Sequence, residues 1–317
     1  MQKGLLLVNL GTPDAPTTED VHVYLDEFLS DPNVIQMPRW LWKPILHRFI
    51  LPTRAWHSAT LYERIWDNGE SPLLKYTRIQ AEQVQALLPD WIVKYAMTYR
   101  LPRIETQLKA LVDAGAEEIV VVPLFPQYTM TTTKTMEEQV AATGIPVHFV
   151  QSFYDNVGYL DLLAKKIGEQ WNAGKYDRLI LSYHGIPQSY VKKGDPYLEH
   201  VNATTRGILQ RLPQLNNENT MQAFQSKFGP MPWLKPYLKQ TLTGLPMKNV
   251  RKVLVATPAF VADCIETIEE IHVENHDAFM EFGGEQFDVV RPFNDDKTFS
   301  EILAKIAQDE LTKAQIK

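Results

Sequence analysis

Arg-Leu-Ile-Leu-Ser-Tyr-His-Gly-Ile-Pro, at residues 178–187, joins a buried strand to a tight turn. The apolar start of this stretch is typical of a strand inside a sheet, and Gly185 and Pro187 end that strand. We therefore expect His184 at the carboxyl end of a parallel strand, where open α/β sheets bind ligands. A histidine in that place can move protons near neutral pH; alternatively, it only hydrogen-bonds the turn backbone.

A second strand, turn and helix follow at residues 253–271. On the expected helix, Asp263, Glu266 and Glu270 are spaced by three and four residues, so they share one face. Like charges at this spacing repel each other, which a solvated helix surface tolerates. The acidic stripe nevertheless begins at the carboxyl end of its strand, on the same side as His184. A histidine beside a line of carboxylates suits a hydrated cation and the movement of protons.

Eight apolar runs alternate with helical stretches along the chain. They lie at residues 4–10, 92–97, 118–124, 147–150, 178–183, 219–225, 252–257 and 287–290. Several are continuously apolar, as strands of a parallel sheet buried on both faces require. The alternation predicts a doubly wound α/β fold. No Gly-x-Gly-x-x-Gly follows any of these runs, so a dinucleotide is not indicated.

The two halves of the chain resemble each other. Residues 5–13 and 179–187 are both a strand followed by glycine, one further residue and proline. Residues 119–128 and 253–262 share a strand, a proline-containing turn and a polar helix start. We expect two related domains that meet near residues 150–175, with the ligand in a central cleft between their sheets.

Composition excludes several classes of protein. The formal net charge of −6 argues against a nucleic-acid binder, which would show a basic footprint. The single cysteine rules out an internal disulfide framework and a cysteine-ligated iron–sulfur cluster. The amino-terminal residues show no signal peptide, and no apolar run reaches the ~18 residues that span a bilayer. We therefore expect a cytoplasmic protein, as a monomer or a weak dimer.

The first half carries an apolar insertion at about residues 34–66, rich in tryptophan and interrupted by three prolines. The prolines argue against one long core helix. We expect either a lip for a flat apolar ligand or an ordinary helical subdomain. Lys43, Arg48 and Arg54 add positive charge. Aromatic plus basic residues also suit the inner face of a membrane, so peripheral contact through residues 34–56 is a third interpretation.

Five stretches of the sequence resemble ferrochelatase, the enzyme that inserts ferrous iron into a porphyrin, and they follow the family's order along the chain. They are Leu-Leu-Val-Asn-Leu-Gly-Thr-Pro at 6–13, Pro-Leu-Phe-Pro-Gln-Tyr at 123–128, Ser-Tyr-His-Gly-Ile-Pro at 182–187, Phe-Gln-Ser-Lys-Phe-Gly-Pro-Met-Pro-Trp-Leu-Lys-Pro at 224–236, and residues 260–270. The last two are long and specific. The chain is similar to bacterial enzymes of the Gram-negative type, which lack an iron–sulfur cluster.

The resemblance implies a fold of two Rossmann-like domains that face a central cleft. We expect an N-terminal domain at 1–155, completed by a C-terminal helix at 298–312, and a C-terminal domain at 156–297. The implied activity is protoporphyrin ferrochelatase, the terminal step of haem biosynthesis, with release of two protons. Porphyrin and Fe(II) are then substrates, and no prosthetic group is expected.

The resemblance also implies roles for single residues. His184 and Glu266 match the family's pocket histidine and glutamate, so they are the expected catalytic pair and the expected metal contacts. The role of the histidine is open between taking protons and delivering metal, and we favour the proton role. Trp233, Phe260 and Leu10 match positions that line the porphyrin.

Other positions are less clear. Ser71 resembles a turn at the ring's edge, although Glu70 interrupts the motif. Asp263 extends the acidic path or caps the helix that begins near Cys264. Cys264 stands where many relatives have a second histidine, and a buried, inert thiol is its expected state. Glu269, off the stripe, is expected to face solvent.

Three further side chains are candidates for binding the porphyrin's propionates. Tyr62 and Tyr128 either bind a propionate or are ordinary buried tyrosines. Arg100 either pairs with a propionate or lies in solvent.

Two alternatives remain beside ferrochelatase. One is a chelatase for cobalt or nickel, which is expected to use two or more histidines at the metal. The other is a non-catalytic haem carrier, which needs no histidine opposite an acidic stripe.

Overall fold

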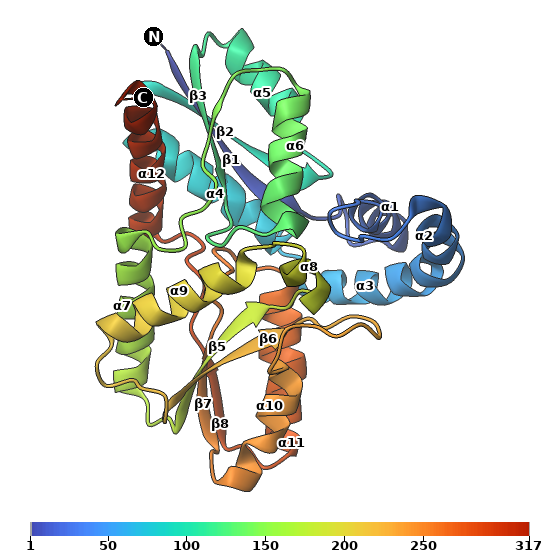
Figure 1. Cartoon of the computed structure of the whole chain (residues 1–317), viewed down its shortest axis with the longest axis vertical. Coiled ribbons are helices and arrows are strands. Elements are labelled where there is room, and N and C mark those ends of the chain that lie inside the picture. Colours follow the sequence, from blue (N-terminus) through green and yellow to red (C-terminus); the bar gives the residue numbers. More distant parts are fainter. Residues whose placement is uncertain (1, 317) are drawn as a thin grey trace. The chain divides into compact units, whose positions relative to one another are not determined.

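The computed structural model describes residues 2–316, and the side chains of residues 2–313. The chain forms two compact units (Figure 1). The first comprises Met1–Ser152 together with Asn294–Lys317, and the second comprises Phe153–Phe293. The expected divisions, after residues 155 and 297, lie a few residues from these limits.

Each unit is an α/β structure with a four-stranded parallel sheet, as the sequence predicted. In the first unit the elements are β1 (Lys3–Gly11), α1 (Thr18–Leu29), α2 (Arg39–Ile45), η1 (Leu46–Ile50), α3 (Leu51–Ile65), α4 (Pro72–Leu87), β2 (Trp91–Tyr99), α5 (Ile104–Asp113), β3 (Glu118–Pro123), η2 (Met130–Lys134), α6 (Thr135–Ala142), β4 (His148–Phe149) and α12 (Lys297–Ile316). In the second they are α7 (Val157–Ala173), β5 (Arg178–His184), α8 (Gln188–Lys192), α9 (Tyr197–Arg211), β6 (Thr220–Gln225), α10 (Leu238–Gly244), η3 (Pro246–Lys248), β7 (Lys252–Ala256), η4 (Glu266–Asn275), α11 (His276–Glu281) and β8 (Gln286–Val289).

Helices cover both faces of each sheet. In the first unit, Leu6 and Val8 of β1 pack with α5 and α6, while α4 and α12 contact the sheet elsewhere. In the second unit, Ile180 of β5 packs against α10, η4 and α11. Successive strand residues point to opposite faces. Since both faces are covered, the central strands are apolar throughout, which explains the continuous runs in the sequence.

The two sheets have the same strand order. It is β2-β1-β3-β4 in the first unit and β6-β5-β7-β8 in the second. The similar stretches at 5–13 and 179–187 lie on the equivalent strands β1 and β5 and the residues after them. Those at 119–128 and 253–262 lie on and after β3 and β7. The internal repeat is therefore a repeat of topology.

The insertion folds differently from our expectation. Residues 39–65 form one uninterrupted helical run of α2, η1 and α3, in which η1 is a π-helix. Pro52 stands in the first turn of α3, where its missing N–H costs little. Pro44 lies inside α2, and the helix changes to π-type bonding just after it. The prolines thus change the hydrogen-bonding pattern without ending the run.

None of the helices within residues 2–316 combines the length and the apolar character that crossing a bilayer requires.

Candidate active site

His184 ends strand β5 in the second unit, as predicted, and its backbone is fixed by its neighbours. It pairs with Gln225 across the β5–β6 ladder. The hydroxyl of buried Tyr197 donates a hydrogen bond to its carbonyl oxygen at 2.9 Å. Burial raises the pKa of Tyr197 far above its ordinary value, so this hydroxyl stays a donor. These contacts hold the histidine at the edge of the sheet.

The ring of His184 has a defined tautomer. Its Nδ1 lies 2.7 Å from the carbonyl oxygen of Gly185. A carbonyl oxygen can only accept, so Nδ1 carries the proton and donates it. In the neutral ring the lone pair is then on Nε2. The turn contact that we considered as an alternative role therefore prepares the imidazole to accept a proton.

Two aromatic rings stand beside this imidazole. The ring centroids of Trp233 and Phe260 each lie 6.5 Å from that of His184, at tilts of 47° and 49°. These two residues come from different loops, after β6 and β7. The structure thus gathers three of the predicted site residues.

The loop that carries Trp233 is attached to the turn after His184. Leu234 N–H donates to the Ile186 carbonyl at 3.0 Å, and the Gln188 amide donates to the Trp233 carbonyl at 3.0 Å. Gly185 makes this approach possible. A Cβ there would lie 2.9 Å from the Gln225 carbonyl oxygen and 3.2 Å from Cε3 of Trp233.

Glu266, Glu269 and Glu270 lie on η4, which is a ten-residue π-helix, whereas Asp263 precedes it. The α-helical spacing that we assumed therefore does not hold, and one prediction is wrong. Glu269 is buried, with 5% of its surface exposed, and does not face solvent. Glu266 and Glu270 are partly exposed. The helical backbone begins at Ile265, next to the expected start near Cys264.

Glu270 is held in a network of hydrogen bonds. Its carboxylate accepts from the backbone N–H of Ser226 at 2.6 Å and from the hydroxyl of the same residue. The Gln225 amide donates to it at 3.2 Å and to the Glu266 carbonyl at 3.3 Å. Ser182 in turn donates to the Gln225 amide oxygen at 2.7 Å. The network joins the ends of β5 and β6 to η4.

Opposing effects act on the proton affinity of Glu270. Burial raises its pKa above the ordinary value, and the Glu266 charge adds to this. Hydrogen bonds from Ser226 and the charge of His184 lower it. The net pKa is raised, so this carboxylate holds a proton more readily than an exposed glutamate does. His184, Glu266 and Glu270 are thus close enough to affect one another electrostatically.

Asp263 and Cys264 precede η4. The Thr267 hydroxyl donates to Asp263 at 2.8 Å and accepts from the Cys264 N–H at 3.0 Å. Cys264 is 7% exposed, so the thiol is buried as expected. Burial raises the pKa of the Cys264 thiol well above its ordinary value, and the nearby Glu266 carboxylate, which hydrogen-bonds with it, adds to this. The thiol therefore stays protonated and is a poor metal ligand.

The expected porphyrin contacts Leu10 and Ser71 lie in the first unit. Leu10 is partly buried and precedes Gly11, whose φ of +120° and whose close approach to Tyr99 exclude a side chain. Ser71 is buried and caps α4 by accepting from Leu74 N–H at 3.2 Å. The intruding Glu70 forms an ion pair with Arg78 at 2.6 Å.

The structure contradicts both interpretations of Arg100. Its guanidinium pairs with Asp14 and, at 3.2 Å, with Glu27, and its side chain is only 17% exposed. It is therefore neither solvent-exposed nor an unpaired cation for a propionate. Its φ of +69° is a left-handed backbone conformation that is uncommon for residues other than glycine.

Tyr62 and Tyr128 differ in how deeply they are buried. Tyr62 is a buried tyrosine that packs edge-on against Tyr24 and Trp66. Tyr128 is partly buried, and its role remains a prediction.

Our reasoning from the sequence missed Ser182, Gln225 and Ser226. All three lie inside the stretches that resemble ferrochelatase, but polar residues at strand ends gave no reason to assign them partners. Ser226 has a φ of +63°, which a sequence pattern does not reveal for a serine. Within residues 2–313, whose side chains are described, no group of three His, Cys, Asp or Glu residues is arranged to hold a metal ion.

The fold is that of the metal chelatases. SirB of Bacillus subtilis, described as a sirohydrochlorin chelatase and solved with Fe3+, superposes with a TM-score of 0.59 over 99% of this chain and 98% of its own. Only 10% of the residues are identical, so this likeness concerns the fold alone. The chain therefore has the fold of the chelatase structures, with two related α/β units.

Sequence comparison gives the family. The ferrochelatase family model matches residues 2–311. A coproporphyrin III ferrochelatase of Lactiplantibacillus plantarum is 52% identical over 307 residues, which is 97% of this chain and 95% of the relative. Another, from Lacticaseibacillus paracasei, is 49% identical and covers 98% of this chain and 97% of its own. The chain belongs to the ferrochelatase family, whose members insert metal into a porphyrin in haem synthesis.

Proposed function

We propose that this chain inserts Fe(II) into coproporphyrin III. The observation that carries this proposal is the name shared by relatives about half identical to it over nearly the whole chain. That name differs from our expectation of protoporphyrin. Coproporphyrin III carries four propionates, one on each pyrrole, whereas protoporphyrin IX carries two. The proposal therefore concerns which porphyrin is metallated, within an activity that the family defines.

His184 is the proposed proton acceptor. Two pyrrole N–H protons must leave the ring as Fe(II) enters, so the products are the iron porphyrin and two protons. Nε2 of His184 holds the lone pair, because Nδ1 donates to Gly185. It accepts one pyrrole proton at a time and passes it on before accepting the next.

Glu266 and Glu270 are the proposed next acceptors. The charge of His184 lowers the pKa of Glu270, which supports a proton path between the two groups. Burial raises that same pKa, so Glu270 can take up a proton at a higher pH than an exposed carboxylate. Asp263 accepts a hydrogen bond from Thr267, precedes this pair in the sequence and would extend the path.

Fe(II) is a substrate that must be released into the ring. We propose that His184 and Glu266 contact it in passing, through one imidazole nitrogen and one carboxylate. A tight site of several ligands would slow the transfer. Cys264 takes no part, since its thiol stays protonated.

Aromatic and apolar side chains hold the macrocycle in this proposal. Trp233 and Phe260 offer flat faces beside His184, and aromatic rings bind a flat apolar ring by stacking. Leu10 and Ser71 of the first unit remain predicted contacts.

The test is anaerobic metallation of the two porphyrins by the purified chain. We expect a kcat/KM for Fe(II) and coproporphyrin III at least about tenfold above that for protoporphyrin IX, since unpaired polar groups at a site discriminate by that amount or more. A preference for protoporphyrin IX would refute the proposed substrate. Binding of either porphyrin without metallation would support a carrier.

We also propose that residues 34–56 contact an anionic membrane surface. Trp40, Phe49 and Trp56 are 78%, 67% and 63% exposed. The same stretch contains Lys43, Arg48 and Arg54 and no acidic residue, in a chain whose net charge is −6. Exposed aromatics with cations are typical of helices that lie in a membrane interface. The cytoplasmic location remains a prediction.

Vesicle sedimentation tests this contact. The chain should sediment with phosphatidylglycerol vesicles and much less with phosphatidylcholine vesicles. A Trp40→Ser, Phe49→Ser, Trp56→Ser variant should lose binding, whereas a control with Val157→Ser, Met247→Ser and Phe282→Ser, all exposed in the second unit, should keep it. Equal sedimentation of both variants, or self-association that depends on the three aromatics without vesicles, would contradict the proposal.

A further inference from the structure

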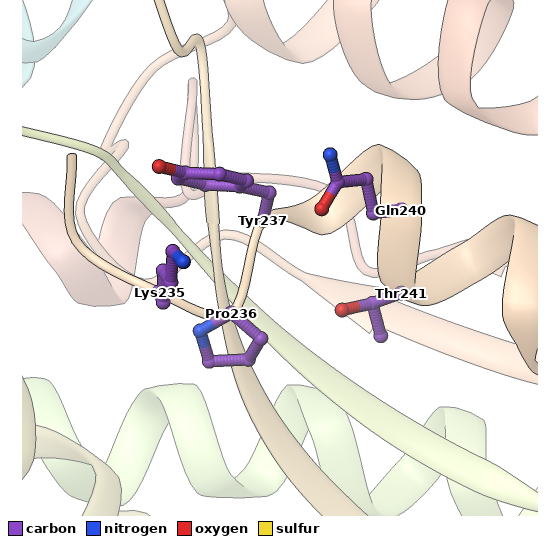
Figure 2. Close-up of a pocket in the computed structure, with 5 residues that line it drawn as sticks. All are labelled: Lys235, Pro236, Tyr237, Gln240 and Thr241. Carbon is purple, nitrogen blue, oxygen red and sulfur yellow. The ribbon is translucent and has the colours of Figure 1, made fainter. Parts of the chain in front are cut away.

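An open hollow of about 490 Å³ lies beside the candidate site in the second unit. Its walls are Lys235, Pro236 and Tyr237, from the segment before α10, and Gln240 and Thr241 from α10 itself (Figure 2). The lining includes an ammonium, an amide and a hydroxyl, from Lys235, Gln240 and Thr241. Such a set of donors suits an anion.

Two lysines share the ring of Tyr237. The Nζ atoms of Lys227 and Lys235 lie 5.4 Å and 5.7 Å from its centroid. Both positions are typical of cation–π contacts, which are weak at exposed sites. Within the residues whose side chains are described, no ion pair joins either ammonium to a carboxylate; Lys227 donates only to the Gly229 carbonyl, at 3.3 Å.

The segment around the two lysines contains no acidic residue that could compensate their positive charge. Residues 226–248 contain four lysines and no aspartate or glutamate, although the whole chain is acidic. Two ammonium groups on one aromatic ring repel each other. An anion that contacts both ammonium groups would offset this charge and would gain two charge-assisted contacts.

Tyr237 connects the two lysines to the candidate site. Its hydroxyl accepts a hydrogen bond from the backbone N–H of Trp233 at 3.4 Å, and Tyr237 also bridges to Phe224 of β6. Trp233 in turn packs beside His184. The lysines are therefore linked through Tyr237 to the aromatic residue proposed to hold the macrocycle.

We propose that Lys227 and Lys235, held over Tyr237, bind a propionate carboxylate of the porphyrin that is metallated at His184. This inference rests on the proposed function. Coproporphyrin III presents a propionate on every pyrrole, so one reaches this hollow in any orientation of the ring. Protoporphyrin IX has propionates on only two pyrroles and can present vinyl or methyl groups there instead. The pair thus favours the four-carboxylate substrate.

A double variant tests the proposal. Lys227→Gln with Lys235→Gln removes both charges and keeps polar side chains. The control is Lys239→Gln with Lys248→Gln, which removes two charges from exposed lysines of the same segment that do not lie on Tyr237. We expect the KM for coproporphyrin III to rise roughly tenfold in the double variant, with kcat unchanged and the KM for protoporphyrin IX changed less than about twofold. The control should match the unsubstituted chain.

Other outcomes would overturn it. An equal rise in KM for both porphyrins, or a rise no larger than in the control, would show that the lysines act only through overall charge. Inhibition by inorganic phosphate that is lost in the double variant, with an unchanged KM for coproporphyrin III, would show a site for free anions only. A chain that metallates protoporphyrin IX but not coproporphyrin III would instead overturn the proposed function.

Discussion

Ser226 gives both of its donors to one carboxylate: its backbone N–H, at 2.6 Å, and its hydroxyl both bond to Glu270. The residue adopts a φ of +63° to do so. A serine in this left-handed conformation costs about 1–2 kcal/mol of backbone strain, which the contacts with Glu270 offset. Ser226 therefore fixes both the position and the proton affinity of Glu270.

Replacing Ser226 should shift the pH dependence of metallation. Hydrogen bonds from Ser226 stabilise the ionised form of Glu270, so their loss raises a pKa that burial has already raised. If Glu270 must be ionised to accept a proton, activity in acid is lost at a higher pH. We expect the acid limb of the kcat profile of Ser226→Gly to move upward by about one pH unit.

Glycine is the informative replacement because it adopts a positive φ without strain. Ser226→Ala, which keeps the strain and loses the hydroxyl, should show the same shift with lower thermal stability. An acid limb that does not move in either variant would exclude a titrating role for Glu270.

Glu266→Gln should lower turnover at least about 100-fold, since a positioned proton acceptor contributes that amount or more. The matched control is Glu274→Gln, an exposed glutamate on the same helix η4, which should change turnover less than twofold. Equal small effects of the two variants, measured as single-turnover rates, would show that η4 carries only a solvated acidic face.

The burial of Glu269 is a feature of the site that could not be predicted from the sequence. The eight strands, the parallel sheets and the end of β5 at His184 followed from apolar runs and from glycine and proline, which act locally. The burial of Glu269 did not, because the α-helical period was applied to a helix that forms π-type bonds. Nothing in the order of residues 266–275 distinguishes the two periods.

Contacts between residues far apart in the sequence could not be predicted either. Arg100 pairs with Asp14 and Glu27, which lie far from it in the sequence. Because such pairs cannot be read from the sequence, the charge of Arg100 was expected to be available for a propionate. Trp40 and Trp42 differ in their exposure, which could not be predicted from the sequence either. Trp42 is buried and donates to the Leu29 carbonyl, whereas Trp40, two residues earlier, is exposed.

Arg100→Ala should therefore affect stability and leave porphyrin binding unchanged. Losing two partly buried charged contacts should lower the free energy of unfolding by about 2 kcal/mol. Arg103→Ala is the comparison, because Arg103 also bonds to Glu27 but is 54% exposed, and it should cost less than about 1 kcal/mol. Urea unfolding and the KM for coproporphyrin III measure the two effects; a raised KM in Arg100→Ala at full stability would restore the propionate role.

Cys264→His tests whether a second imidazole improves catalysis. We expect a rate change of less than about threefold, because the buried thiol takes no part and His184 and Glu266 already supply the base and the carboxylate. The larger ring should cost about 1–3 kcal/mol of stability by overpacking. Turnover and melting temperature need to be measured together, since a large gain in rate at unchanged stability would contradict the single-histidine account.

The most direct test of the account is the single-turnover metallation of coproporphyrin III by His184→Ala, with and without added imidazole. Removal of the Nε2 acceptor should lower the rate at least about 100-fold while porphyrin affinity and thermal stability stay near those of the unsubstituted chain. Imidazole, which fits the space left by the side chain, should restore part of the rate in a manner that follows its unprotonated fraction. A folded His184→Ala variant that metallates coproporphyrin III at the full rate would contradict the proton-acceptor role.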